Sequence, residues 1–186
     1  MARVRLNETA DLPEDYRWLF ERLEKQGPIL NIFRALSHSP EALLRFMRFG
    51  SYFLDGSGKL DPKLRELAIL RAGYLCRSPY EFSQHVAFGR RAGLSDEKIR
   101  AIPTPDASSF DANELAVLSF ASELTTESRV SDATFSAVQA FLSPQELVEL
   151  TMVTGVYNFV SRTLNALEID LDTPAAKDLA EIGVDL

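Results

Sequence analysis

The sequence predicts an all-α protein with a single domain of about eight helices that spans residues 1–186. Apolar residues recur at helical spacing along nearly the whole chain, and alternating runs typical of strands are scarce. Hydrophobic residues make up 46% of the sequence, with only nine glycines and nine prolines, which is enough for one buried core. This composition excludes a disordered chain, a collagen-like repeat and a disulfide scaffold.

Proline and glycine mark the ends of the predicted N-terminal helices. Pro13 suits the first position of one helix, which ends at Gly27. A second, shorter helix begins at Pro28. Ser39 and Pro40 then begin a third helix with a wide apolar face, so we expect that helix to be well buried.

A helical hairpin over residues 62–93 is the most strongly specified part of the sequence. Asp61 caps its first helix, and the turn that follows is only a few residues long. The second helix begins at Ser78, with Glu81 in the third position of a predicted capping box, and it ends at Gly93.

The remaining chain is predicted to be helical apart from one loop and the tail. Pro103 and Pro105 interrupt the helical pattern, so the segment around them is a loop. The acidic tail after Leu167 is expected to be exposed or packed against a partner. The predicted helices here are a short one from Ser95, those at 111–126 and 131–142, and one from a Ser143 capping box to about Leu167.

The charge balance excludes several classes of partner. The chain has 27 acidic and 20 basic residues, a net charge of −7, which repels nucleic acid and anionic lipid. No run approaches the roughly 18 apolar residues of a membrane span, and the first residues lack a signal peptide's apolar block, so a cytoplasmic protein is expected. Cys76 is the only cysteine, which excludes an internal disulfide. Possible metal ligands are not clustered, so neither a metal nor a cofactor is expected.

Two titratable residues of the hairpin are candidates for acid–base chemistry. His38 and His85 are the only histidines, and His85 follows Glu81 by four residues, on the same helical face. Glu66 lies in the preceding helix, at an expected depth of roughly 15 Å from the turn against roughly 10 Å for His85. We therefore expect a direct contact, or one through a single water molecule, in which a buried carboxylate tunes the imidazole.

Structural explanations also exist for each of these residues. The capping box would account for Glu81, and His85 would also suit a hydrogen-bonded position in the core. Glu66 would find a partner in a nearby arginine such as Arg71. Cys76 is most simply a small buried hydrophobic residue, although a position just before a helix would lower its pKa.

Residues 62–102 resemble the core segment of the carboxymuconolactone decarboxylase family, which is related to the alkyl hydroperoxidase D proteins. The resemblance rests on Glu66 within RELAILR, on YEFSQH at 80–85 and on the AGLSDEKI turn at 92–99. Residues 146–169 are similar to the last helix of the members of about this length. The resemblance implies an all-α fold and a homo-oligomer, either a dimer, a trimer or a hexamer.

The resemblance also bears on the activity. The peroxidase branch of the family uses a C-x-x-C pair, whose two positions fall here on Ser78 and Glu81, so its disulfide relay cannot operate. The decarboxylase branch lacks this pair, and the resemblance to it implies His85 and Glu66 as candidate acid–base residues. Glu81, one helical turn from His85, completes the set of candidate catalytic residues on spacing alone. The residues proposed to bind substrate are Arg71, Tyr80, Tyr157 and Arg162.

Three functions are compatible with these residues. The first is a cofactor-free, lyase-type enzyme that acts on a small unsaturated carboxylic acid or lactone through His85 and Glu66. The second is an antioxidant peroxidase that uses Cys76 as its redox residue together with an external thiol. The third is a non-catalytic oligomer that binds a small apolar acid.

Overall fold

The computed structural model describes residues 2–186, and in this range it confirms the all-α prediction, with ten α-helices and no strand. Two short 3₁₀ turns, Thr9–Asp11 and Glu14–Tyr16, precede them. The helices are α1 (Arg17–Glu24), α2 (Asn31–Leu36), α3 (Pro40–Leu54), α4 (Pro62–Leu75), α5 (Pro79–Arg91), α6 (Asp96–Ala101), α7 (Ala112–Thr126), α8 (Asp132–Gln139), α9 (Pro144–Leu167) and α10 (Thr173–Ile182).

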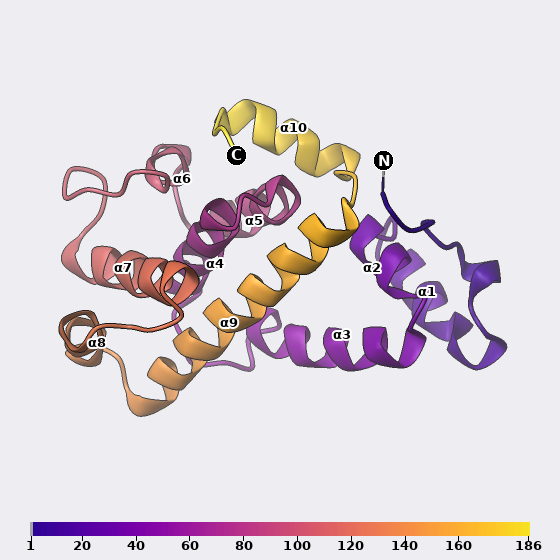
Figure 1. Ribbon diagram of the computed structural model, residues 1–186, viewed down its shortest axis with the longest axis horizontal. Coiled ribbons are helices and arrows are strands. Elements are labelled where there is room, and N and C mark those ends of the chain that lie inside the picture. The colour runs from indigo at the N-terminus through magenta and orange to yellow at the C-terminus, as the bar shows by residue number, and fades with distance from the viewer. Residues whose placement is uncertain (1) are drawn as a thin grey trace.

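Helix α4 forms the centre of the core and packs against α5, α7 and α9. Leu67, Ala68, Ile69 and Leu70 are all fully buried, so α4 is surrounded on every side rather than on one stripe. Figure 1 shows α9 running diagonally across the molecule, with α1 and α2 at one end and α6 to α8 at the other. A polar residue on α4 is therefore removed from bulk water.

The predicted hairpin is present as α4 and α5. The turn between them contains Arg77 in the left-handed region, with φ of 50°. Gly73 allows the two helices to approach closely, because a Cβ added there would lie 3.4 Å from the backbone nitrogen of Phe82. The capping box predicted at Ser78 is wrong, since the Ser78 side chain caps no backbone N–H group. The box predicted at Ser143 is confirmed.

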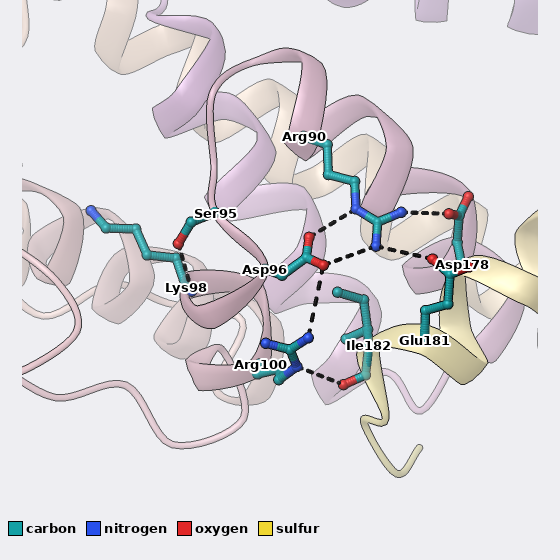
Figure 2. Close-up of polar contacts among 8 residues, drawn as sticks. All are labelled: Arg90, Ser95, Asp96, Lys98, Arg100, Asp178, Glu181 and Ile182. Carbon is teal, nitrogen blue, oxygen red and sulfur yellow. Dashed lines mark hydrogen bonds and ion pairs between the residues drawn. The ribbon is translucent and has the colours of Figure 1, made fainter.

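The acidic tail packs within its own chain, which corrects the expectation of an exposed or partner-bound end. Helix α10 lies against α5, as Figure 1 shows. Figure 2 shows Arg90 of α5 paired with Asp96, Asp178 and Glu181, so that one guanidinium joins α5, α6 and α10. The sequence indicated the negative charge of the tail, but it did not indicate that Arg90 forms ion pairs with the tail.

A second cluster of hydrogen bonds ties the start of α10 to α2 and α5. The Asp172 carboxylate accepts hydrogen bonds from the Tyr80 hydroxyl, from Gln84 Nε2 at 2.8 Å and from the Asn31 backbone N–H at 3.1 Å. The Ile32 backbone N–H donates to the Tyr80 hydroxyl at 3.2 Å. These bonds hold α2 in place beside α5, where α2 forms part of the wall of the cavity described below.

The outer face of α9 carries three exposed apolar side chains, Val148, Met152 and Phe159. None of the helices in residues 2–186 has both the length and the apolar character required to cross a membrane. The homo-oligomer and the cytoplasmic location stay predictions.

Candidate functional site

Glu66 of α4 and His85 of α5 meet in the core, which confirms the contact expected from their depths in the hairpin. His85 Nδ1 lies 2.7 Å from Glu66 Oε2. Glu66 is completely buried and His85 is 4% exposed. Glu66 lies in the part of α4 that is buried on every side, His85 lies on the buried face of α5, and the antiparallel packing of α4 and α5 brings them to the same level.

Glu81 occupies the other side of the same ring. Its Oε1 atom lies 3.1 Å from His85 Nε2, one turn away along α5. Since Ser78 forms no cap and its buried hydroxyl has no hydrogen-bond partner, the capping box does not explain Glu81. The imidazole is therefore held between two carboxylates.

Arg65 completes this cluster. It is the arginine that pairs with Glu66, whereas the sequence suggested Arg71 as a possible partner. Arg65 Nε donates to Glu66 Oε1 at 2.9 Å, and Arg65 Nη1 donates to the Phe53 backbone carbonyl at 2.8 Å. With His85 protonated, the cluster contains two cations and two carboxylates. Its formal charge is then zero, which is the arrangement that buried ionised groups require.

The environment of His85 favours its charged form. Burial alone would lower the pKa of the imidazole, but the carboxylates of Glu66 and Glu81 outweigh burial and raise the pKa to about 9. Burial would likewise raise the pKa of Glu66, yet the charges of His85 and Arg65 lower it. At neutral pH the pair is therefore an imidazolium and a carboxylate.

Two aromatic rings fix the orientation of the imidazole. The Phe88 ring stacks on it with a centroid distance of 4.9 Å, and the Tyr157 ring meets it edge-on at 4.7 Å. Burial, followed by the charges of Glu81 and Glu66, raises the pKa of Tyr157 well above its ordinary value. Tyr157 therefore stays a neutral phenol and keeps a proton to donate.

A cavity of about 400 Å³ opens beside this cluster. Its floor consists of the buried residues Glu81, His85 and Tyr157, whereas Glu66 lies behind His85 and outside the wall. Exposed polar residues, Gln26, Ser51 and Asp55, form its mouth. The apolar wall between mouth and floor includes Leu30, Ile32, Phe33, Phe46, Met47 and Val160. The imidazole is therefore packed in the core and also reachable by a small molecule.

The other residues proposed to bind substrate divide between wall and scaffold. Tyr80 lines the cavity, but its hydroxyl is occupied by Asp172. Arg71 donates to Ser122 at 2.7 Å and to the Ile102 backbone carbonyl at 2.8 Å, on the side of α4 that faces α7. Arg162 donates to Asn158 at 2.7 Å. Neither arginine lines the cavity, so neither is available there to bind an anion.

Cys76 lies outside the cavity wall. Its thiol is 3.5 Å from Asn158 Oδ1, and burial raises its pKa, so the lowered pKa considered from its position before a helix is wrong. Within the described part of the chain, no group of three or more histidine, cysteine, aspartate and glutamate side chains is arranged to hold a metal ion.

The all-α fold that carries this buried glutamate–histidine pair is the fold of alkylhydroperoxidase D-like structures. The chain is similar to an uncharacterized peroxidase-related protein with the alkylhydroperoxidase core from Ralstonia eutropha JMP134 (TM-score 0.79, 20% identity, 94% of each chain covered). It is also similar to a putative antioxidant defence protein from Agrobacterium tumefaciens (TM-score 0.69, 23% identity), over 74% of this chain and 95% of that one.

A third similar structure is a cysteine-to-alanine variant of the debrominase Bmp8 in complex with 2,3,4-tribromopyrrole (TM-score 0.77, 18% identity, 98% of this chain and 100% of that one covered). No curated protein sequence matches the chain. Residues 40–123 match the model of the carboxymuconolactone decarboxylase family. The segment that matches this family lacks the C-x-x-C pair.

Proposed function

We propose that the protein is a cofactor-free acid–base enzyme of the lyase type, acting on a small unsaturated carboxylic acid or lactone. The observation that carries this proposal is the imidazole of His85, held between the carboxylates of Glu66 and Glu81 at the floor of an apolar cavity. A proton donor and a carboxylate base 3.1 Å apart are the pair that proton transfer to and from carbon requires.

Each residue of the floor has a distinct role in this proposal. The Glu81 carboxylate removes a proton from the carbon next to the substrate carbonyl. The electron pair of that C–H bond moves into the conjugated system, and the Tyr157 phenol hydrogen-bonds the oxygen that gains negative charge. His85 Nε2–H returns a proton at a conjugated carbon, or to a leaving oxygen when a ring C–O bond breaks. The proton on Glu81 then restores His85.

Glu66 acts through His85 and is a positioning residue. Its hydrogen bond to Nδ1 fixes the ring and leaves the Nε2 proton directed toward Glu81 and the cavity. General acid–base catalysis of this kind contributes about 10²- to 10⁴-fold to a rate.

The antioxidant alternative has weaker support. It requires a reactive thiolate, but burial raises the pKa of Cys76 and the thiol lies away from the cavity. A non-catalytic binding protein would need the same cavity, and it differs from the enzyme in showing no proton transfer.

Deuterium exchange into a simple unsaturated lactone tests the proposal. α-Angelica lactone has an acidic C–H group next to its carbonyl, and incorporation of deuterium from D₂O is followed by NMR. We expect the wild-type protein to accelerate incorporation, and His85→Asn and Glu81→Gln to lose at least 100-fold of that acceleration. His38→Asn is the matched control, since His38 is exposed and contacts the Arg5 carbonyl far from the floor.

Circular dichroism and thermal melting establish that each variant is folded. Folded variants that exchange at the wild-type rate would contradict the proposal, and so would a wild-type protein that exchanges no faster than buffer.

A further inference from the structure

We infer that the cavity takes neutral, largely apolar carbonyl compounds, of which a lactone is one, and excludes molecules that carry a free carboxylate. This inference rests on the proposed function, because it chooses between the two substrate types named there. It concerns the charge of the ligand and therefore has a test that requires no turnover.

The floor offers no unpaired cation to a carboxylate. Among residues 2–186, neither lysine nor arginine lines the cavity. The one cationic group of the wall is the His85 imidazolium, whose two nitrogens already face Glu66 and Glu81. A carboxylate entering beside Glu81 would meet a second negative charge and would lose its hydration without gaining an unpaired cation as a partner, which carries a large free-energy cost.

The mouth of the cavity also disfavours anions. Asp55 is exposed at the rim, and the whole chain carries a net charge of −7. Charges of one sign around an opening reduce the local concentration of ions of that sign. Anions are therefore disfavoured at the entrance as well as at the floor, whereas neutral molecules are unaffected.

The middle of the cavity favours apolar ligands of limited size. Aliphatic and aromatic side chains from α2, α3 and α9 separate the mouth from the floor. The volume of about 400 Å³ lies near the lower end of the 300–1,000 Å³ that is typical of small-molecule sites. The polar groups of the floor stand at one end only, as expected for a ligand with one polar group and an apolar body.

Two dyes that differ by a single charged group test this inference. N-phenyl-1-naphthylamine is neutral, and 8-anilino-1-naphthalenesulfonate has the same rings with an added sulfonate. Both become fluorescent in apolar surroundings, and titration gives a dissociation constant for each. We expect the neutral dye to bind the wild-type protein at least tenfold more tightly than the anionic one.

Two glycine variants locate the binding site. Gly50 lines the cavity, and a Cβ added there meets no heavy atom within 4 Å, so Gly50→Leu adds side-chain volume at the cavity wall from a position that is open for the Cβ. Gly155 is equally open, but it is exposed on α9 outside the cavity wall, so Gly155→Leu is the matched control. We expect Gly50→Leu to weaken the neutral dye at least fivefold and Gly155→Leu to leave its affinity unchanged.

Removal of one negative charge tests the electrostatic reason directly. Glu81→Gln leaves the imidazolium with one carboxylate in place of two, so we expect the ratio of the affinity for the sulfonate dye to the affinity for the neutral dye to rise at least tenfold. Circular dichroism verifies the fold of this variant.

Two results would overturn the inference. One is equal or tighter binding of the sulfonate dye to wild type with a loss of that binding in Gly50→Leu. The other is indifference of both dyes to Gly50→Leu, which would show that the cavity takes neither. Either result leaves deuterium exchange into the lactone unaffected, so failure of this inference is distinguishable from failure of the proposed function.

Discussion

His85 Nε2 and Glu81 Oε1 lie 3.1 Å apart at the floor of the cavity, while His85 Nδ1 is hydrogen-bonded to Glu66 at 2.7 Å behind it. One nitrogen of the ring is thus anchored in the core, and the other faces a group that a ligand can reach. This division explains how a completely buried carboxylate influences chemistry in a cavity that it does not line.

The first prediction concerns the charge of Glu66. Glu66→Gln retains the shape of the side chain but removes the charge that raises the pKa of His85. We expect lactone exchange to fall about 10- to 100-fold, as is typical when an outer partner of a catalytic group is lost, and the alkaline limb of the pH profile to move to lower pH.

Glu149→Gln is the matched control for that variant. Glu149 is also buried, but it accepts hydrogen bonds from Tyr52 and from the backbone of Lys59 and Leu60, away from the floor. Its loss should lower the free energy of unfolding by about 1–3 kcal/mol and leave exchange by the folded protein unchanged. Equal effects of the two variants on the pH profile would refute the role of Glu66.

The second prediction separates two arginines of α4. Arg71→Met removes hydrogen bonds to Ser122 and to the Ile102 carbonyl, so we expect a loss of about 2–3 kcal/mol of stability with an unchanged pH profile. Arg65→Met instead removes the cation beside Glu66. The Glu66 carboxylate then stabilises the protonated form of His85 more strongly, so the pKa of His85 rises and the alkaline limb of the pH profile moves to higher pH. Urea unfolding and the exchange rate as a function of pH distinguish these outcomes, and a moved limb in Arg71→Met would contradict the assignment.

The third prediction is the pH dependence of stability. The pKa of His85 is about 9 in the folded protein against an ordinary value of 6.5, so the folded state retains a proton that the unfolded state releases. The stabilisation is complete below pH 6.5 and is lost as the pH rises to about 9. The loss is about 3 kcal/mol. Urea unfolding of wild type and His85→Asn should differ in slope over this pH range, and parallel curves would argue against a charged His85.

The fourth prediction concerns Cys76. Because burial raises its pKa, the thiol should react slowly with iodoacetamide at pH 7, at no more than the rate of free cysteine. Cys76→Ser should leave lactone exchange intact. Rapid alkylation at pH 7 would instead favour the antioxidant function.

The sequence was sufficient to predict the hairpin and the meeting of Glu66 with His85, because caps and helical rise determine position along a helix. The side of a helix from which a given side chain projects was harder to predict. Nothing in the pattern distinguished Arg65 from Arg71 as the partner of Glu66, because α4 is buried on all sides and has no marked polar face. The tail helix was missed for a related reason, since its acidic residues are balanced by Arg90, which is distant in sequence.

Nuclear magnetic resonance of labelled histidine tests the central claim most directly. In the His38→Asn variant, His85 is the one histidine that remains, so its ring ¹⁵N shifts can be followed without overlap from about pH 5 to about pH 10.5. We predict a doubly protonated imidazolium at pH 7 and an apparent pKa of about 9. A single neutral tautomer at pH 7, or a titration at or below pH 6.5, would contradict the charged glutamate–histidine–glutamate cluster and the chemistry proposed for it.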